Sequence, residues 1–201
     1  MYSTSIFINW IVDYKVTPGN RVGQPRSQLR GCIWGRILGV TTELLEAQRF
    51  IPAPADEIFA VLCDPQGHVA IDSSGMLMDA EGEPVSAAGD SFVVHMDREA
   101  LGDFDLGRYD VTVTIKEFEP DKLISWTISG NIKPPIRHVY GYRLEPADGG
   151  TLVTSFYDWS EIDDHWRKAA IFPVIPQTAL RATLGILERA VVRGYPRAAR
   201  R

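Results

Sequence analysis

The chain has 201 residues, of which 45% are hydrophobic and 23% are charged, and its formal net charge is −5. This length accommodates one well-filled domain, and the composition is that of a globular protein rather than a disordered or fibrous one. The acidic balance argues against a nucleic-acid partner, because proteins that bind nucleic acids usually carry a basic face that neutralises phosphates.

Residues 1–39 differ from the rest of the chain. They contain five basic residues and one acid, with two prolines, five glycines and no stable periodicity. We interpret them as a poorly ordered or loosely docked extension, in which Ile6–Val12 packs on the domain, or else as a segment that precedes a translation start near Val40. The domain is expected over residues 40–195, and residues 196–201 are expected to form a basic tail.

The hydrophobic segments and the cysteines indicate the cellular location of the protein. No window reaches the roughly 18–20 apolar residues of a membrane helix, and SIFINWIVDY lacks the basic start and cleavage site of a signal peptide. Cys32 and Cys63 do not make a disulfide framework, and Cys63 has the pattern of a small buried hydrophobe. We therefore expect a cytoplasmic protein without stable membrane insertion.

From residue 43 the elements become regular. EAQRFIPA predicts a short strand, and PADEIFAVLCD predicts a helix with proline in its first turn and acids at its positive end. The following stretch, DPQGHVAIDSSG, is rich in turn residues and ends this helix, since Asp64 precedes a proline.

Five segments then alternate apolar and polar residues, as half-buried strands do. They cover residues 91–97, 109–118, 123–130, 138–146 and 151–159, and ADGG predicts a tight hairpin between the last two. In the clearest of them Tyr109, Val111, Val113 and Ile115 share one face.

A helix over 178–193 closes the chain, with Leu180, Leu184, Leu187 and Val191 on one stripe. Helices near both ends of a run of antiparallel strands predict an α+β fold rather than a parallel sheet. One helix laid across a curved sheet does not fill the concavity, so we expect a cavity between them.

Three segments carry a resemblance to a known family: PAPADEIFAVLCDP, FEPDKLISW and LEPADGGTLV. In this order and spacing they resemble the START-like, or SRPBCC, superfamily, in particular its polyketide cyclase/dehydrase and Bet v-allergen-like members, over about residues 47–192. The resemblance implies a helix-grip fold: about seven antiparallel strands wrapped around a long C-terminal helix, with two short helices after the first strand. It implies a pocket for a small hydrophobic molecule, but its members differ in function.

His68 and Asp72 are the candidate catalytic residues. Their spacing of four places them side by side on a helix, where the carboxylate would tune the imidazole as an acid–base pair at the cavity mouth. The alternative is structural: the segment ends one helix, a short second helix carries His68, and Asp72 with Ser73 turns the chain at Gly75. The structural interpretation is favoured, with the segment at the pocket rim.

The inward-facing aromatic residues of the later strands are the candidate ligand contacts. Rings with polar tips would hold a flat or isoprenoid ligand, or else they simply fill the core. On the last strand we place Val153, Ser155 and Tyr157 inward. The predicted ligand-binding residues are Phe92, Met96, Val113, Trp126, Tyr140, Tyr142, Tyr157 and Leu184.

The sequence contains no motif for metal binding, for a nucleophilic serine or for a nucleotide cofactor. The four histidines show no metal-ligand spacing, no serine lies in a Gly-x-Ser-x-Gly elbow, and no glycine-rich loop joins a strand to a helix. We therefore expect no metal and no cofactor. Residues 161–176 are either a flap over the pocket entrance or an ordinary loop with apolar anchors.

Three functions remain open at this point. The first is a binding or carrier module for a small hydrophobic, lipid- or polyketide-like molecule, and the alternative is a polyketide cyclase or aromatase that uses acid–base groups in the same pocket. A regulatory protein–protein module has no positive signature. Convergence of a histidine with a tyrosine at hydrogen-bonding distance would favour the enzyme.

Overall fold

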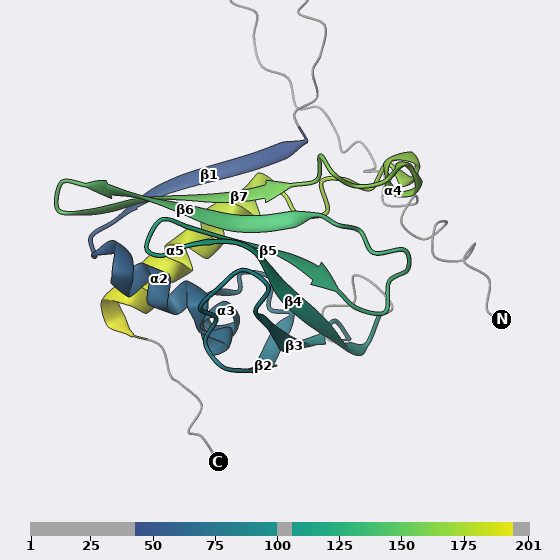
Figure 1. The fold of residues 1–201 in the computed structure, drawn as a ribbon, viewed down its shortest axis with the longest axis horizontal. Helices are drawn as coiled ribbons and strands as arrows, with labels where there is room; N and C mark the ends of the chain where they lie inside the picture. Colours follow the sequence, from purple (N-terminus) through teal and green to yellow (C-terminus); the bar gives the residue numbers. More distant parts are fainter. Residues whose placement is uncertain (1–42, 100–105, 195–201) are drawn as a thin grey trace, which may run out of the picture. The chain divides into compact units, whose positions relative to one another are not determined.

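The computed structural model describes residues 43–99 and 106–194. The predicted N-terminal extension, with its Ile6–Val12 segment, and the predicted tail 196–201 lie outside the described residues. Seven strands form one antiparallel sheet in the order β1-β7-β6-β5-β4-β3-β2 (Figure 1). They are β1 (Leu44–Ile51), β2 (Leu77–Glu81), β3 (Ser91–Asp97), β4 (Arg108–Glu119), β5 (Leu123–Ser129), β6 (Val139–Ala147) and β7 (Gly150–Asp158).

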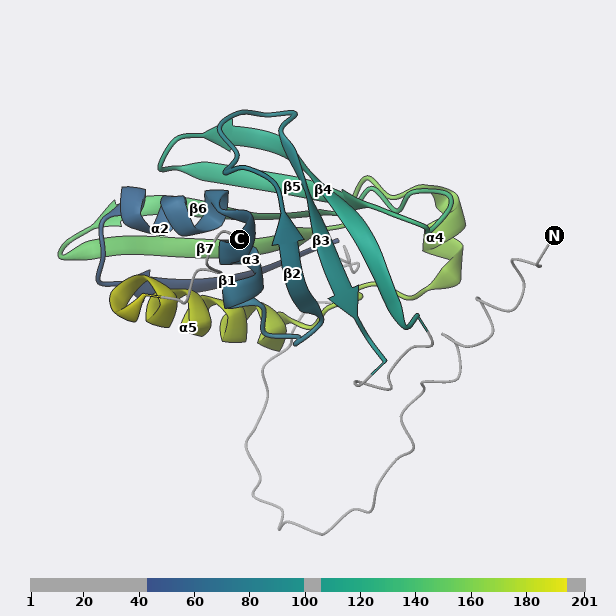
Figure 2. The ribbon, with the colours of Figure 1, turned by 90° about the horizontal axis from the view of Figure 1, so that it is seen from below.

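The helices lie between and after the strands. They are α2 (Ala55–Cys63), α3 (Pro65–Ile71), α4 (Asp164–Ala169) and α5 (Gln177–Arg193). In Figure 2, α2, α3 and α5 lie on one side of the bent sheet, where α5 packs against β1 and β7 and both short helices contact it. The predicted α+β helix-grip plan is therefore confirmed, including the two short helices after the first strand.

Two elements had not been predicted from the local pattern. Strand β2 is a five-residue edge strand whose pairing with β3 is interrupted at Met78, so its alternation is too short to recognise. Helix α4 has only six residues, but its beginning is marked in the sequence, because the Asp163 side chain accepts a hydrogen bond from the backbone N–H of His165.

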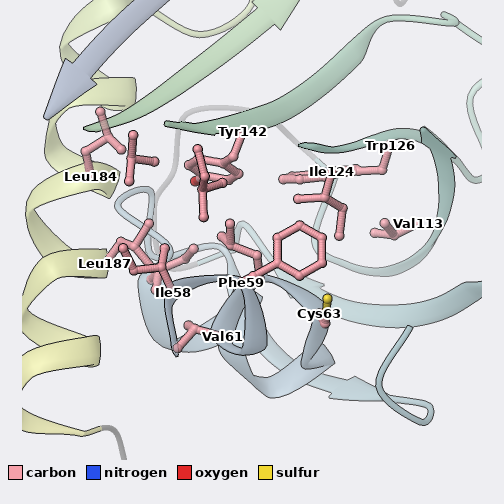
Figure 3. Packing of buried hydrophobic residues seen from close by; sticks show 14 of the residues in the cluster. Ile58, Phe59, Val61, Cys63, Val113, Ile124, Trp126, Tyr142, Leu184 and Leu187 are labelled. Atoms are coloured by element: carbon pink, nitrogen blue, oxygen red, sulfur yellow. The ribbon is translucent and has the colours of Figure 1, made fainter. Parts of the chain in front are cut away.

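One face of the sheet, here called the inner face, carries the core. Register pairs Trp126 with Tyr140 and Tyr140 with Tyr157, so these rings lie side by side across β5, β6 and β7. Figure 3 shows Leu184 and Leu187 of α5 directed toward α2 in the same core. The predicted inward placement of the β7 residues is correct, since Val153, Ser155 and Tyr157 alternate on the inner face.

The apolar stripe of α5 differs slightly from the predicted one. Leu180, Leu184 and Leu187 are buried as expected, but Ala190 completes the buried stripe, and Val191 is only partly buried. Ala190 follows Leu187 by three residues, so it lies on the same face of the helix as Leu187.

The segment DPQGHVAIDSSG begins at the junction of α2 and α3. Asp64 ends α2 and also begins α3, where its side chain accepts a hydrogen bond from the Gln66 backbone N–H at 3.0 Å. Pro65 occupies the first turn of α3. Gly67 then passes so close to α2 that a Cβ atom there would overlap the carbonyl oxygen of Val61. The angle between the two helices depends on this glycine.

Replacing Gly67 with alanine is expected to lower the free energy of unfolding by about 2 kcal/mol or more, because the obstructing atom belongs to the backbone and cannot rotate away. Gly185 in α5 offers the matched control, since a Cβ atom there meets nothing within 4 Å. G185A is expected to raise stability by about 0.5–1 kcal/mol. Urea unfolding of both variants tests this, and equal effects would contradict the packing described.

Candidate functional site

The inner face is not covered evenly. In Figure 2 the β3–β4 ends of the sheet extend past α3 and α5. Partly buried apolar residues pack against the core from this region and the loops beside it, namely Leu77, Met96, Tyr109, Ile128, Ile136, Tyr140, Phe172 and Ile175. We call this part of the molecule the open end.

A pocket of about 650 Å³ lies at the ends of β3 and β4 and extends to the outer face of the sheet, which carries His95, Asp97, Arg108 and Asp110. It is lined by Met78, His95, Met96, Asp97, Arg108, Tyr109, Asp110 and Asn131. Met96 and Tyr109 face each other across β3 and β4, and both also pack against the core. The charged lining residues pair among themselves, Arg108 with Asp97 at 2.9 Å and His95 with Asp110 at 2.7 Å.

Six rings form a continuous group from β5 to the loop before α5. This aromatic cluster consists of Trp126, His138, Tyr140, Tyr157, Trp159 and Phe172. The closest stacking is between Tyr140 and Tyr157, with ring centroids 4.7 Å apart and planes at 23°. His138 meets three of the rings edge-on, those of Tyr140, Tyr157 and Phe172. The cluster is rigid and mostly apolar, with hydroxyl groups at two positions.

The Tyr157 hydroxyl connects three parts of the cluster. It lies 3.0 Å from Nδ1 of His138. It also interacts with the Tyr140 hydroxyl and with the backbone N–H of Val174. Strands β6 and β7 and the segment before α5 therefore meet at one buried oxygen.

Burial keeps these groups uncharged. Desolvation lowers the pKa of His138 to about 4, so its imidazole is neutral at neutral pH. Desolvation also raises the pKa of the Tyr140 and Tyr157 hydroxyls well above the usual value, and the neighbouring Tyr109 contributes to the shift at Tyr140. The histidine is thus a weak base and the tyrosines are weak acids, which suits hydrogen bonding better than proton transfer.

His68 is a core residue in this structure. Its ring lies between Phe92 and Trp126, with centroids 4.9 Å and 4.8 Å away, and its Nε2 donates to the Leu62 carbonyl at 2.8 Å. The carbonyl can only accept, so Nε2 carries the hydrogen. Burial lowers the pKa of His68 to about 4.

Asp72 has a different set of partners. Its carboxylate accepts hydrogen bonds from the backbone and hydroxyl of Ser74 and from the backbone of Leu77, so it organises the turn that leads into β2. Ser73 donates to the Ala179 carbonyl in the first turn of α5. These bonds match the structural interpretation of the segment, and no hydrogen bond between His68 and Asp72 is present in the described part of the chain.

The predicted ligand-binding residues divide into two groups. Met96 and Tyr140 are partly exposed at the open end, and Met96 lines the pocket. The others are buried in the core cluster, namely Phe92, Val113, Trp126, Tyr142, Tyr157 and Leu184. These six side chains occupy the space between the sheet and the helices, and their role in ligand binding stays a prediction.

Sequence reasoning did not select three residues of the site. His138 alternates with Tyr140 and Tyr142 along β6, but its bond to Tyr157 depends on the β6–β7 register. Tyr109 was recognised only as a strand residue. Phe172 lies in a segment without periodicity, and only the fold shows that it stacks on Trp159 at 6.4 Å.

The segment between β7 and α5 packs onto the aromatic cluster. Phe172 contacts the rings of His138 and Trp159, and the Val174 backbone binds Tyr157. Helix α4 precedes these residues and is tied back by the ion pair of Arg167 with Glu43. This packing is expected both of a flap over the pocket entrance and of an ordinary loop with apolar anchors, so both interpretations of residues 161–176 stay predictions.

Other chemistries have little support in the geometry. Within residues 43–99 and 106–194, no group of three or more His, Cys, Asp or Glu side chains is arranged to hold a metal ion. Cys63 is buried, which raises the pKa of its thiol to about 11 and makes it a poor nucleophile. None of the described helices combines the length and apolar character needed to cross a membrane.

Comparisons with known proteins add a family and a fold. The family model described as "Polyketide cyclase / dehydrase and lipid transport" matches residues 42–192. No curated protein matches the chain. A solved structure from Chromobacterium violaceum is similar, with 15% identity, a TM-score of 0.54, and coverage of 74% of this chain and 96% of that one.

Two further solved structures have the same fold. A protein from Mesorhizobium loti shares 18% identity with a TM-score of 0.53, over 76% of this chain and 99% of its own. The Aha1 dimer from Colwellia psychrerythraea shares 19% identity with a TM-score of 0.50, over 76% and 98%. At these identities the likeness establishes the fold alone.

The buried histidines predict a loss of stability in weak acid. Because the pKa of His68 is about 4 in the folded chain and 6.5 for an ordinary histidine in water, the unfolded chain binds more protons between these pH values. The contribution of each buried histidine to the free energy of unfolding is fully present above about pH 6.5 and is lost as the pH drops toward 4. At about pH 5 the loss is about 2 kcal/mol per histidine. Urea unfolding at about pH 7.5 and 5 measures the difference.

Two variants separate the contributions of individual histidines to the pH dependence of stability. H68Q is expected to be less stable at both pH values but to lose about 2 kcal/mol less between them. His95 is the control, because its bond to Asp110 raises its pKa and so favours the folded state in acid. H95Q is expected to make the acid-induced loss larger. An unchanged pH dependence in H68Q would contradict the burial described for His68.

Proposed function

The chain belongs to the polyketide cyclase/dehydrase and lipid transport family, and we propose that it binds a small hydrophobic, lipid- or polyketide-like molecule at the open end of the inner face. The main supporting observation is the pocket of about 650 Å³ at the ends of β3 and β4, where the inner-face residues Met96 and Tyr109 line the pocket and also pack against the core. A pocket of this size accommodates a ligand of roughly drug size.

The apolar surface at the open end supplies the free energy for binding. Met96, Tyr109, Ile128 and Phe172 are partly exposed although they pack against the core. Covering such surface yields roughly 25 cal/mol for each Å² removed from water, so a few hundred Å² overcome the cost of immobilising a small ligand. The fully buried rings behind these residues form the rigid wall against which the ligand packs.

The same site is less suited to the alternative, a cyclase or aromatase. His138 and Tyr157 do converge at 3.0 Å, which is the arrangement that acid–base catalysis requires. Their pKa values, however, move away from neutrality in opposite directions, with that of His138 near 4 and that of Tyr157 raised. Binding without proton transfer is therefore the better supported function. The cytoplasmic location stays a prediction.

A charge placed in the pocket wall tests the binding site. The uncharged fluorophore N-phenyl-1-naphthylamine is expected to bind the full chain saturably and to brighten as it leaves water. In M96K, binding is expected to weaken by about tenfold or more, because a lysine in an apolar contact must be desolvated. Fluorescence titration of both proteins measures the change.

V192K is the matched control. Val192 is 56% exposed on the last turn of α5 and does not line the pocket, so the same substitution there is expected to leave the affinity unchanged. Thermal unfolding of both variants verifies that they are folded. If M96K binds the fluorophore as tightly as V192K does, the site lies elsewhere.

A further inference from the structure

Two loops beside the pocket expose apolar side chains. They are residues 130–137, which join β5 to β6, and residues 170–176, which join α4 to α5, and we call them the rim loops. Ile132 in the first is 38% exposed and Val174 in the second is 40% exposed. Asn131, the neighbour of Ile132, lines the pocket, so the rim loops border the proposed binding site.

The rim loops are anchored to one another and to the core. His138 directly follows the first loop, and its ring meets that of Phe172 in the second loop edge-on, with centroids 6.3 Å apart. Ile136 and Ile175 pack against the core from the two loops. Figure 1 and Figure 2 both show the connection between β5 and β6 at the same end of the sheet as α4. The exposed side chains of the two loops therefore belong to one surface.

This surface carries positive charge. The rim loops contain Lys133 and Arg137 and no acidic residue. Both side chains are exposed, and neither forms an ion pair within the part of the chain that the structure describes. The acids between β7 and α4 are engaged locally, namely Asp158 with the Ser160 backbone, Glu161 with Lys116 and Asp163 with the His165 backbone. The two cations are therefore available to an anionic partner.

The composition of the rim loops favours a lipid surface as that partner. Pro134 and Pro135 lie in the first loop, and Pro173 and Pro176 flank the exposed part of the second. Because proline has no backbone N–H, fewer donors lose their water when these loops leave it. A protein partner would need a complementary surface of about 800 Å² on each side. A bilayer needs only apolar side chains beside cations, which bind at the boundary between headgroups and acyl chains.

We propose that the rim loops dock reversibly on an anionic lipid surface. Ile132 and Val174 enter the headgroup region, while Lys133 and Arg137 contact lipid phosphates. Docking brings the pocket next to a phase in which small hydrophobic molecules are dissolved. The inference goes beyond the proposed function and does not depend on it, since binding to a bilayer requires no ligand in the pocket.

Co-sedimentation with vesicles at low ionic strength tests the proposal. The full chain is expected to bind vesicles of phosphatidylcholine and phosphatidylglycerol at least tenfold more tightly than vesicles of phosphatidylcholine alone. K133Q/R137Q is expected to lose about tenfold in affinity for the anionic vesicles, because two contacts with phosphates disappear. V174S is expected to lose severalfold, because less apolar surface leaves water.

Two variants outside the rim loops are the matched controls. K122Q/R193Q removes the same charge from the turn before β5 and from the last turn of α5, and V192S changes a valine that is 56% exposed. Both are expected to bind the anionic vesicles as the unmodified chain does. The proposal is overturned if the rim-loop variants bind as tightly as their controls, if the full chain does not distinguish the two kinds of vesicle, or if it binds neither.

Titration with N-phenyl-1-naphthylamine in the absence of vesicles reports on the proposed function separately. Its affinity is expected to be the same in all four variants, because none of the substituted side chains lines the pocket. This result also verifies that the variants are folded. An unmodified chain that binds anionic vesicles through the rim loops but does not bind the fluorophore would refute the proposed function and leave the docking surface intact.

Discussion

The antiparallel register of β5, β6 and β7 is the constraint on which the site depends. It aligns Trp126, Tyr140 and Tyr157 on one face, one ring to each strand. A slip of one residue between β6 and β7 would turn the Tyr157 ring to the outer face and separate its hydroxyl from both His138 and Tyr140. The tight turn between the two strands holds this register, since Ala147 pairs with Gly150 at its base.

The position of the helices decides which part of the inner face is free. Helix α5 covers β1 and β7, and the α2–α3 pair packs beside it because Gly67 permits a close approach to Val61. Together they bury the middle of the sheet, where Trp126 and Tyr142 meet helix side chains. The open end remains uncovered by these helices, and the pocket lies there. The centre of the aromatic cluster is therefore part of the core, and the proposed binding site lies beside it.

Three histidines differ in their chemistry because their surroundings differ. His68 lies between Phe92 and Trp126 and is a neutral core residue. His138 is also neutral, but its Nδ1 is hydrogen-bonded to the Tyr157 hydroxyl. His95 lies on the outer face beside Asp110, which raises its pKa. His68, the sequence-based catalytic candidate, is a core residue, and the buried hydrogen bond to Tyr157 is made by His138.

The sequence by itself determined the fold class, the face on which each strand residue lies and the turn character of residues 64–75. These features follow from periodicity and from the conformations of proline, glycine and capping residues, which act over a few neighbouring positions. Only the tertiary structure decided that Phe172 stacks on Trp159, that the Tyr157 hydroxyl joins His138 to Tyr140, and that most predicted pocket residues fill the core. Contacts of this kind join residues far apart in the chain, and their geometry depends on register and helix placement, which no local pattern specifies.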